Sequence, residues 1–230
     1  MTLDLYGFGP ALLAGTWMTI KLALSALCLG LVLGLLGALA KTSPHKPLQW
    51  LGGTYSTLVR GVPELLWVLL IYFGTVNMMR SIGDSLGIED LALSPFAAGT
   101  IALGLCFGSY ATEVFRGAIL AIPRGHREAG LALGLSKGRT LWRIILPQMW
   151  RIALPGLGNL FMILMKDTAL VSVIGLQELM RHSQIGVTAS KDALSFFLAA
   201  ALIYLCLTVV AMIAMHFIER RASRGFVRSA

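Results

Sequence analysis

Charged residues are scarce in this chain: Asp, Glu, Lys and Arg together make up 13% of its 230 residues. A soluble domain usually carries about 25% charged residues. The hydrophobic share of 57% and the mean hydropathy of +0.78 also lie outside the soluble class. The run 22–40 holds no charge, and only His216 interrupts the apolar run 193–218. About 20 apolar residues span a bilayer as a helix, so the composition predicts an all-α, single-domain membrane protein.

Cysteine and histidine are few as well. Cys28, Cys106 and Cys206 all lie inside apolar runs without metal-ligand spacing, so we expect small buried hydrophobic residues rather than a disulfide or a metal site. Four scattered histidines and the lack of a G-x-S-x-G motif argue against a membrane hydrolase. The chain also lacks a G-x-x-x-x-G-K-S/T loop, so it does not bind ATP in that way. We therefore expect no catalytic residue, metal or cofactor.

Neither a removable leader nor an internal repeat is apparent. Residues 1–14 contain Asp4 and no Lys or Arg, and no small-residue cleavage pattern closes the first apolar run. A signal peptide is therefore not expected. Many secondary transporters consist of duplicated halves, and the absence of a repeat argues against that class.

Five transmembrane spans are predicted from the apolar runs. They cover about residues 15–40, 58–80, 95–117, 151–175 and 193–218. The fourth span contains Pro155, Gly156 and Gly158, so we expect an unwound region at 155–159. Irregular backbone at membrane depth is tolerated where it faces protein or a water-filled cavity. A chain of this size is too small to enclose a translocation path alone, so we expect it to pair with a like subunit.

The distribution of Lys and Arg predicts the orientation in the membrane. The connection 41–60 carries three of them, the connection 116–151 carries seven and the tail after residue 218 carries four. The connections on the other side, 80–94 and 176–192, are poorer in Lys and Arg. Positive residues collect on the cytoplasmic side, so we expect a periplasmic amino terminus and a cytoplasmic carboxyl terminus. Because the positive charges lie beside apolar runs, the net charge of +8 indicates membrane topology rather than nucleic-acid binding.

The cytoplasmic loop, about residues 118–150, contains the most informative motif. In order, the motif consists of Glu128, Ala129, Gly130, Gly134, Ile144, Leu146 and Pro147, which gives E-A-G-x3-G-x9-I-x-L-P. We expect one helix over 124–135, with Leu131 and Leu135 on the same face, and a second helix that Ser136 caps and that ends near Pro147. Small side chains in the first helix suit insertion into a groove on a partner protein. The alternative is an interfacial helix held by lipid headgroups, which the arginines of the loop would favour.

The motif resembles the E-A-A-x3-G-x9-I-x-L-P signature of bacterial ABC-importer permeases and departs from it only at Gly130. Further segments resemble the polar amino-acid permeases of that group. These segments are Arg60–Leu66, Leu70–Gly74, Tyr110–Gly117 and Lys166–Ser172. The resemblance covers nearly the whole chain and is strongest to the histidine/lysine/arginine/ornithine branch and the related opine permeases. It implies the fold of a type I ABC importer permease in the bacterial inner membrane.

The resemblance also implies partners and a docking site. Two cytoplasmic ATPase subunits would hydrolyse ATP and dock on Glu128, Ala129, Gly130, Leu131, Gly134 and Leu135. A second permease subunit, identical or paralogous, would complete the path through the lipid. A periplasmic binding protein would deliver a polar, cationic amino acid (arginine, ornithine, lysine or histidine) or a related opine. The rival interpretations are an ion-coupled secondary transporter or channel without an ATPase, and a membrane enzyme or assembly scaffold.

Ionisable groups within spans are functional candidates because a bilayer makes them costly. Glu113 is expected near the cytoplasmic surface, paired with Arg116 at i+3. Glu64, beside Arg60 at i−4, is expected to form an ion pair on the gate side or with a neighbouring subunit. Substrate contact is the alternative for both carboxylates.

Two further residues are candidates for the substrate path. Asp167 would meet the ammonium group of a bound amino acid, cap the segment 168–173, or pair with Lys166 or a neighbouring subunit. Asn159 would line the cavity at the predicted unwound region. Glu64, Glu113, Asn159 and Asp167 are therefore the substrate-path candidates.

Overall fold

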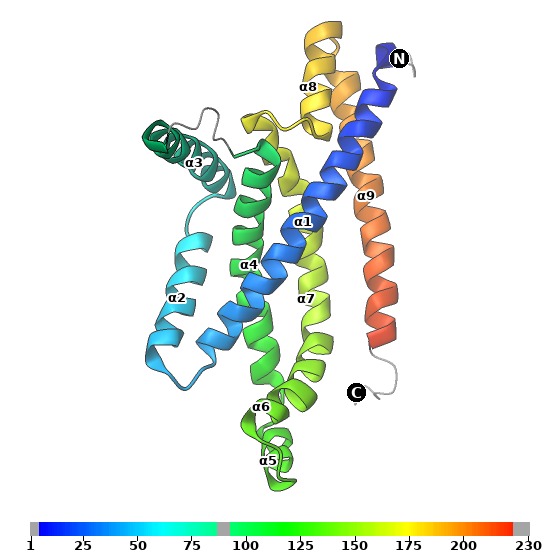
Figure 1. Cartoon of the computed structure of the whole chain (residues 1–230). Coiled ribbons are helices and arrows are strands. Elements are labelled where there is room, and N and C mark those ends of the chain that lie inside the picture. Colours follow the sequence, from blue (N-terminus) through cyan, green and yellow to red (C-terminus); the bar gives the residue numbers. More distant parts are fainter. Residues whose placement is uncertain (1–4, 87–92, 223–230) are drawn as a thin grey trace.

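The structure, a computed structural model, is all-helical and describes residues 5–86 and 93–222 (Figure 1). The helices with at least eight residues are α1 (Gly9–Lys41), α2 (Lys46–Arg60), α3 (Glu64–Leu86), α4 (Pro95–Ala121), α5 (Arg124–Ala132), α7 (Leu146–Asp167), α8 (Leu179–Ser190) and α9 (Ala193–Ala222). The shorter ones are η1 (Leu5–Gly7), α6 (Lys137–Thr140), the π-helical segment η2 (Leu141–Ile145) and the 3-10 segment η3 (Thr168–Ile174). Three parts of the chain on which predictions rested lie outside the described residues: Asp4, the centre of the connection 80–94 and the tail after residue 222.

Four of these helical segments are long and apolar enough to cross a membrane: α1, α4, the continuous segment 137–174 and α9. The pair α2 and α3 passes the same test together, although its two axes are bent by 103°, which gives up to five candidate spans. The predicted fold class, an all-α membrane protein of about five spans, is thereby confirmed.

The break between α2 and α3 lies at Gly61–Pro63. Proline has no backbone N–H and disfavours the helical conformation of the residue before it, so a helix ends ahead of it. The second predicted span, 58–80, falls across this break, and no single straight helix covers it. Its membrane crossing stays a prediction.

The centre of the bundle is the crossing of α1 and α4, where α1 runs diagonally over α4 (Figure 1). Small residues let the two backbones approach, as in many membrane helix pairs. A Cβ atom on Gly34 would lie 2.6 Å from the Cβ of Ala111, and one on Gly30 would lie 2.9 Å from the carbonyl oxygen of Gly104. The close approach therefore depends on the absence of side chains at these positions.

Helix α7 continues through Pro155, so the predicted unwound region at 155–159 is wrong. A proline removes one backbone donor, and neighbouring helices compensate for that loss in many membrane helices. The irregular backbone lies instead at the two ends of α7, in η2 before it and in η3 after it. η3 ends at Gly175, whose φ of 89° is left-handed. The path of the chain therefore changes beyond Asp167 rather than in the middle of α7.

The cysteines are free, and only Cys106 is buried. Cys28 and Cys206 are exposed on the surface of the chain, so the expected burial is wrong for these two. An apolar run in a membrane helix faces lipid as readily as protein, and apolar surroundings in the sequence therefore do not identify burial.

Candidate functional site

Helix α5 lies beyond the end of α4, outside the bundle of long helices (Figure 1). Its side chains at Glu128, Ala129 and Leu131 are exposed. Leu133, which follows the helix, is 81% exposed; the sequence analysis did not single it out. Glu128 and Leu131 on this short helix, together with Leu133 just after it, form a compact surface for a protein partner.

Gly134 gives α5 its ending. The N–H of Leu135 donates to the carbonyl oxygen of Gly130 at 3.1 Å, and the N–H of Gly134 donates to that of Leu131 at 2.9 Å. This pair of bonds is a Schellman motif, which requires a left-handed residue after the helix cap. The φ of Gly134 is 77°, a conformation that suits glycine. The second Gly of the motif therefore sets the turn that separates α5 from α6.

Gly130 is the one buried residue of α5. A Cβ atom there would lie 2.8 Å from Thr140 Cγ2 and 2.9 Å from Ile144 Cδ1. The departure from the alanine of the permease signature thus accompanies close packing of α5 against α6 and η2. His126 Nδ1 also lies 2.7 Å from Gln148 Oε1 of α7. One contact therefore packs α5 against α6 and η2, and the other joins it to the start of α7.

Two expectations for this loop are wrong in detail. Leu135 does not share a helical face with Leu131, because α5 ends at Ala132 and the chain turns at Gly134. Ser136 does cap the next helix, by accepting from the N–H of Arg139 at 3.4 Å. The helical path does not end near Pro147, because it continues through η2 into α7, and Pro147 lies in the first turn of α7.

Glu113 is the centre of an ion network at the α5 end of the bundle. Its carboxylate accepts from Arg116 Nε at 2.9 Å, as expected for the i+3 pair, and also contacts Lys41 Nζ at the end of α1. Arg60 Nη1 of α2 lies 3.8 Å from the same carboxylate. The side chain of Glu113 is 24% exposed. It therefore links α1, α2 and α4, and Lys41 is a partner that sequence spacing alone did not reveal.

Glu64 does not form an ion pair with Arg60, its neighbour at i−4. Within the described ranges, Arg60 forms its ion pair with Glu113, and its guanidinium lies 5.6 Å from the ring centre of Tyr110. Glu64 instead accepts a hydrogen bond of 3.1 Å from the hydroxyl of Tyr110. The break before α3 reorients the chain, so the i+4 spacing of one straight helix does not apply.

Glu64 and Asp167 line the same small cavity between α3, α4 and α7, together with Tyr110 and Cys106. The side chain of Asp167 makes no capping hydrogen bond to η3, which removes the capping role that the sequence allowed. The cavity thus combines two carboxylates and a phenol hydroxyl with apolar walls.

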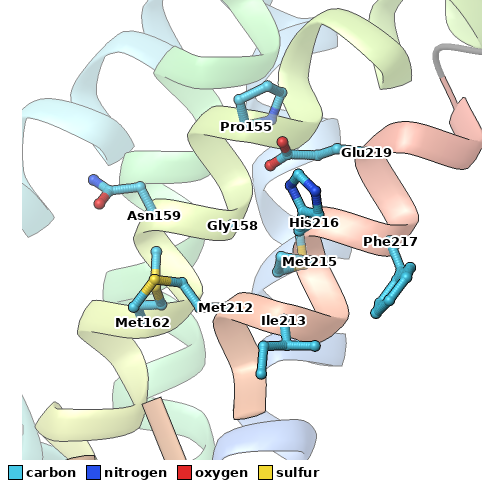
Figure 2. Close-up of a pocket in the computed structure, with 10 residues that line it drawn as sticks. All are labelled: Pro155, Gly158, Asn159, Met162, Met212, Ile213, Met215, His216, Phe217 and Glu219. Atoms are coloured by element: carbon cyan, nitrogen blue, oxygen red, sulfur yellow. The ribbon is translucent and has the colours of Figure 1, made fainter. Parts of the chain in front are cut away.

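Asn159 lies elsewhere, in an open cleft of about 480 Å³ between α7 and α9. Figure 2 shows that Asn159 and Met162 come from α7, whereas Met212, His216 and Glu219 come from α9. The four substrate-path candidates therefore fall in three places: Glu64 and Asp167 together, Glu113 in the ion network and Asn159 in this cleft. No group of three or more potential metal ligands gathers within the described part of the chain.

Apolar helices with an exposed polar helix beyond one end form the architecture of a membrane permease subunit. The chain belongs to the family described as binding-protein-dependent transport system inner membrane component, whose model matches residues 30–224. It is a multi-pass inner-membrane permease and not itself the catalytic subunit; members of this family work with an ATPase and a binding protein.

Relatives match along almost the entire chain. The histidine/lysine/arginine/ornithine transport system permease protein HisQ of Salmonella typhimurium is 41% identical over 225 residues, which cover 98% of this chain and 99% of that protein. The octopine transport system permease protein OccQ of Rhizobium meliloti is 42% identical over 232 residues, with 98% of each chain covered. Among solved structures, an amino acid ABC transporter crystallised with histidines matches with a TM-score of 0.79 and 32% identity, covering 96% of this chain and 100% of that chain.

Proposed function

We propose that this chain is the permease subunit of an ABC importer for a cationic amino acid or a related opine. The observation that carries the substrate class is the shared cavity of Glu64 and Asp167, with the Tyr110 hydroxyl beside Glu64. A carboxylate in an apolar setting favours a positively charged partner. The cavity measures about 20 Å³ in this structure, so it has to widen before its two carboxylates meet the cationic groups of arginine, lysine or ornithine. The names of HisQ and OccQ point to the same class.

The ATPase docks on α5 in this proposal. The docking surface consists of Glu128, Ala129, Leu131 and Leu133, while Gly130 and Gly134 set the position and the turn of the helix, and Leu135 follows that turn. The contacts of α5 with η2 and α7 would transmit ATPase closure to the spans. Two ATPase subunits and a second permease subunit, identical or paralogous, complete the transporter, and a binding protein delivers the substrate.

The orientation follows from the same arrangement. Figure 1 places α5 and the end of α9 at one end of the bundle, and α8 and the start of α1 at the other. If the basic α5 end is cytoplasmic, the amino terminus is periplasmic and the carboxyl terminus cytoplasmic. The predicted spans 15–40, 58–80, 95–117, 151–175 and 193–218 then cross the membrane alternately.

Competition for uptake tests the substrate class. The assembled transporter is energised with ATP in proteoliposomes, and radiolabelled arginine uptake is measured against excess ornithine, lysine, histidine or glutamine. We expect the cationic amino acids to compete and glutamine to have little effect. Transport of glutamine alone would reject the cationic class, and uptake driven by an ion gradient without the ATPase would reject the ABC mechanism.

Asp167→Asn tests the cavity in the same assay. The amide keeps the size of the side chain and removes its charge, so KM for arginine should rise by about tenfold, which corresponds to the loss of roughly one charge-assisted hydrogen bond. Glu219→Gln, which removes a carboxylate charge from the cleft between α7 and α9, serves as a comparison and should leave KM unchanged. An unchanged KM in Asp167→Asn would remove Asp167 from the substrate path.

Leu133→Glu tests the docking surface. A charge at this exposed position should reduce the amount of ATPase that co-purifies with the permease, without loss of the folded chain. Lys137→Glu, exposed on α6, changes the charge outside α5 and should retain the ATPase. Equal ATPase retention by the wild type, Leu133→Glu and Lys137→Glu would contradict docking on α5.

A further inference from the structure

A second cleft, of about 510 Å³, opens where the ends of α1 and α4 meet α5. Four basic side chains line it: Lys41, Arg116, Arg124 and Arg127. Glu128 is the acidic residue of the lining, and the remaining wall is mainly apolar. Glu128 and Leu131, which belong to the proposed docking surface, also line the cleft, and the ion network around Glu113 accounts for Lys41 and Arg116 but not for Arg124 and Arg127.

The basic residues of the cleft differ in their partners. Lys41 and Arg116 both contact the carboxylate of Glu113. Arg124 and Arg127 form no ion pair with any residue that the structure describes, and both are exposed. Glu113 is shared among Lys41, Arg116 and Arg60, so Glu128 is the one carboxylate of the lining that can offset Arg124 and Arg127. The cleft therefore offers a ready site for an anion, held by two arginines.

The apolar part of the lining indicates which anion fits. Ile119 and Leu120 come from the last turns of α4, and Leu120 is 63% exposed. Both residues belong to a candidate membrane span, Pro95–Ala121. A soluble phosphate would use the arginines but not this wall. A phospholipid would use both, with its phosphate at the arginines and its acyl chains along α4.

We propose that this cleft binds the phosphate of an anionic phospholipid. Arg124 and Arg127 hold the phosphate, since a guanidinium can donate two parallel hydrogen bonds to phosphate oxygens. Basic pockets between spans on the cytoplasmic side are suited to lipid headgroups. That this end of the bundle meets the cytoplasmic leaflet rests on the proposed orientation. The bound lipid would occupy the junction between the two long helices and α5.

The test compares lipid binding by two double variants of the full-length permease. Arg124→Gln with Arg127→Gln removes the charges of these two arginines from the cleft. Lys137→Gln with Arg139→Gln removes the same charge from α6, outside the cleft. Purified proteins are titrated with phosphatidylglycerol in detergent, and retained lipid is counted by native mass spectrometry, with phosphatidylcholine as the neutral lipid. We expect the cleft variant to lose about tenfold in affinity for phosphatidylglycerol, and the α6 variant to bind as the wild type does.

Further measurements distinguish the lipid from other occupants of the cleft. Arg124→Lys with Arg127→Lys keeps the charge and should keep most of the binding, which also controls for misfolding of the glutamine variant. Inorganic phosphate at equal concentration should not displace the lipid; displacement would assign the cleft to free phosphate and overturn the proposal. Equal loss in both glutamine variants would show non-specific attraction and would also overturn it.

The ATPase contact is measured separately on the same variants, by co-purification. Unchanged lipid binding with loss of the ATPase from the cleft variant would assign the cleft to the ATPase and overturn the lipid proposal. Loss of lipid binding with the ATPase retained supports it. Lipid retention is measured on the permease without ATPase or transport, so its failure can be distinguished from failure of the uptake and docking tests of the proposed function.

Discussion

Lys41 and Glu113, 72 residues apart in the chain, form an ion pair that joins the end of α1 to α4. Arg116 of α4 and Arg60 of α2 approach the same carboxylate. One acidic side chain thus compensates cations from three helices, at the end of the bundle that leads to α5. The crossing of α1 and α4 is therefore secured by charge at this end and by small residues along its length.

Glu113→Gln should destabilise the permease. The substitution preserves size but leaves Lys41 and Arg116 without their anionic partner, which should lower the free energy of unfolding by about 1.5–3 kcal/mol, the range for hydrogen bonds to charged groups. A drop in the melting temperature of the detergent-purified protein would measure it. Glu219→Gln is the matched control, since Glu219 of α9 forms no ion pair with the described residues. Equal melting temperatures for the two variants would refute the structural role of Glu113.

Gly134→Ala should weaken ATPase binding through the backbone. An L-residue in the left-handed conformation costs about 1 kcal/mol, so the turn after α5 should shift and present Leu133 differently. Gly125→Ala adds the same methyl group in the first turn of α5, where the Cβ would meet open space and where alanine favours helix. We expect co-purification of the ATPase to fall for Gly134→Ala and to hold for Gly125→Ala. If both variants behave alike, the left-handed turn does not matter for docking.

Long-range and local features of this fold differ in how well the sequence predicts them. The bilayer requires long apolar helices, so the runs 22–40 and 193–218 indicated helices from composition alone, and α1 and α9 contain them. The ion pair between Glu113 and Arg116 was also predictable, because side chains three residues apart on a helix are neighbours. The contact with Lys41 was not, because it depends on the angle at which α1 crosses α4.

Two helix boundaries had signals in the sequence that the predicted bounds missed. A proline disfavours helix at the residue before it, so Pro63 indicated that α2 and α3 are separate helices. A glycine just after a short helical segment is a common stop signal, so Gly134 indicated the end of α5 before Leu135. The helicity of α7 through Pro155 was not predictable, because no local pattern distinguishes a tolerated proline from a helix break. The cavity expected for Asn159 at an unwound segment is therefore absent, and Asn159 lies in a different cavity from Asp167.

Gly34→Leu should disrupt the crossing of α1 and α4. A Cβ atom at this position would lie 2.6 Å from that of Ala111, and a larger side chain forces the helices apart. Overpacking of a well-packed core typically costs about 1–3 kcal/mol, so we expect a lower melting temperature and less folded protein. Gly53→Leu adds the same side chain to α2, where a Cβ would meet nothing within 4 Å. A Gly34→Leu protein as stable as Gly53→Leu would contradict the close approach.

Glu178 predicts a dependence of stability on pH. This residue lies between η3 and α8, outside the predicted spans, and is 0% exposed. Its carboxylate accepts from the N–H groups of Met180 and Arg181 at 2.9 and 2.7 Å and from the hydroxyl of Tyr204 at 3.1 Å. Burial raises the pKa of Glu178, and these hydrogen bonds offset the rise only in part.

The sign of the effect follows from this raised pKa. The folded protein holds the proton of Glu178 more tightly than the unfolded chain does, so the linked stability is fully present below the unfolded pKa of about 4.3. It is lost as the pH rises through the higher folded pKa. Glu178→Gln does not titrate at this position. The stability of the wild type relative to Glu178→Gln should therefore fall as the pH rises across this window.

Melting temperatures of the wild type and Glu178→Gln, measured from about pH 2.5 to pH 8, test this difference. Asp192 provides a control of opposite sign, because hydrogen bonds from Ser195 lower its pKa. Its linked stability is present above the unfolded pKa of Asp and lost as the pH falls through the lower folded pKa. The wild type should therefore lose stability relative to Asp192→Asn toward acid pH, whereas it loses stability relative to Glu178→Gln toward neutral pH. If the wild type loses stability in the same pH direction relative to both variants, the pKa of Glu178 is not raised in the folded protein.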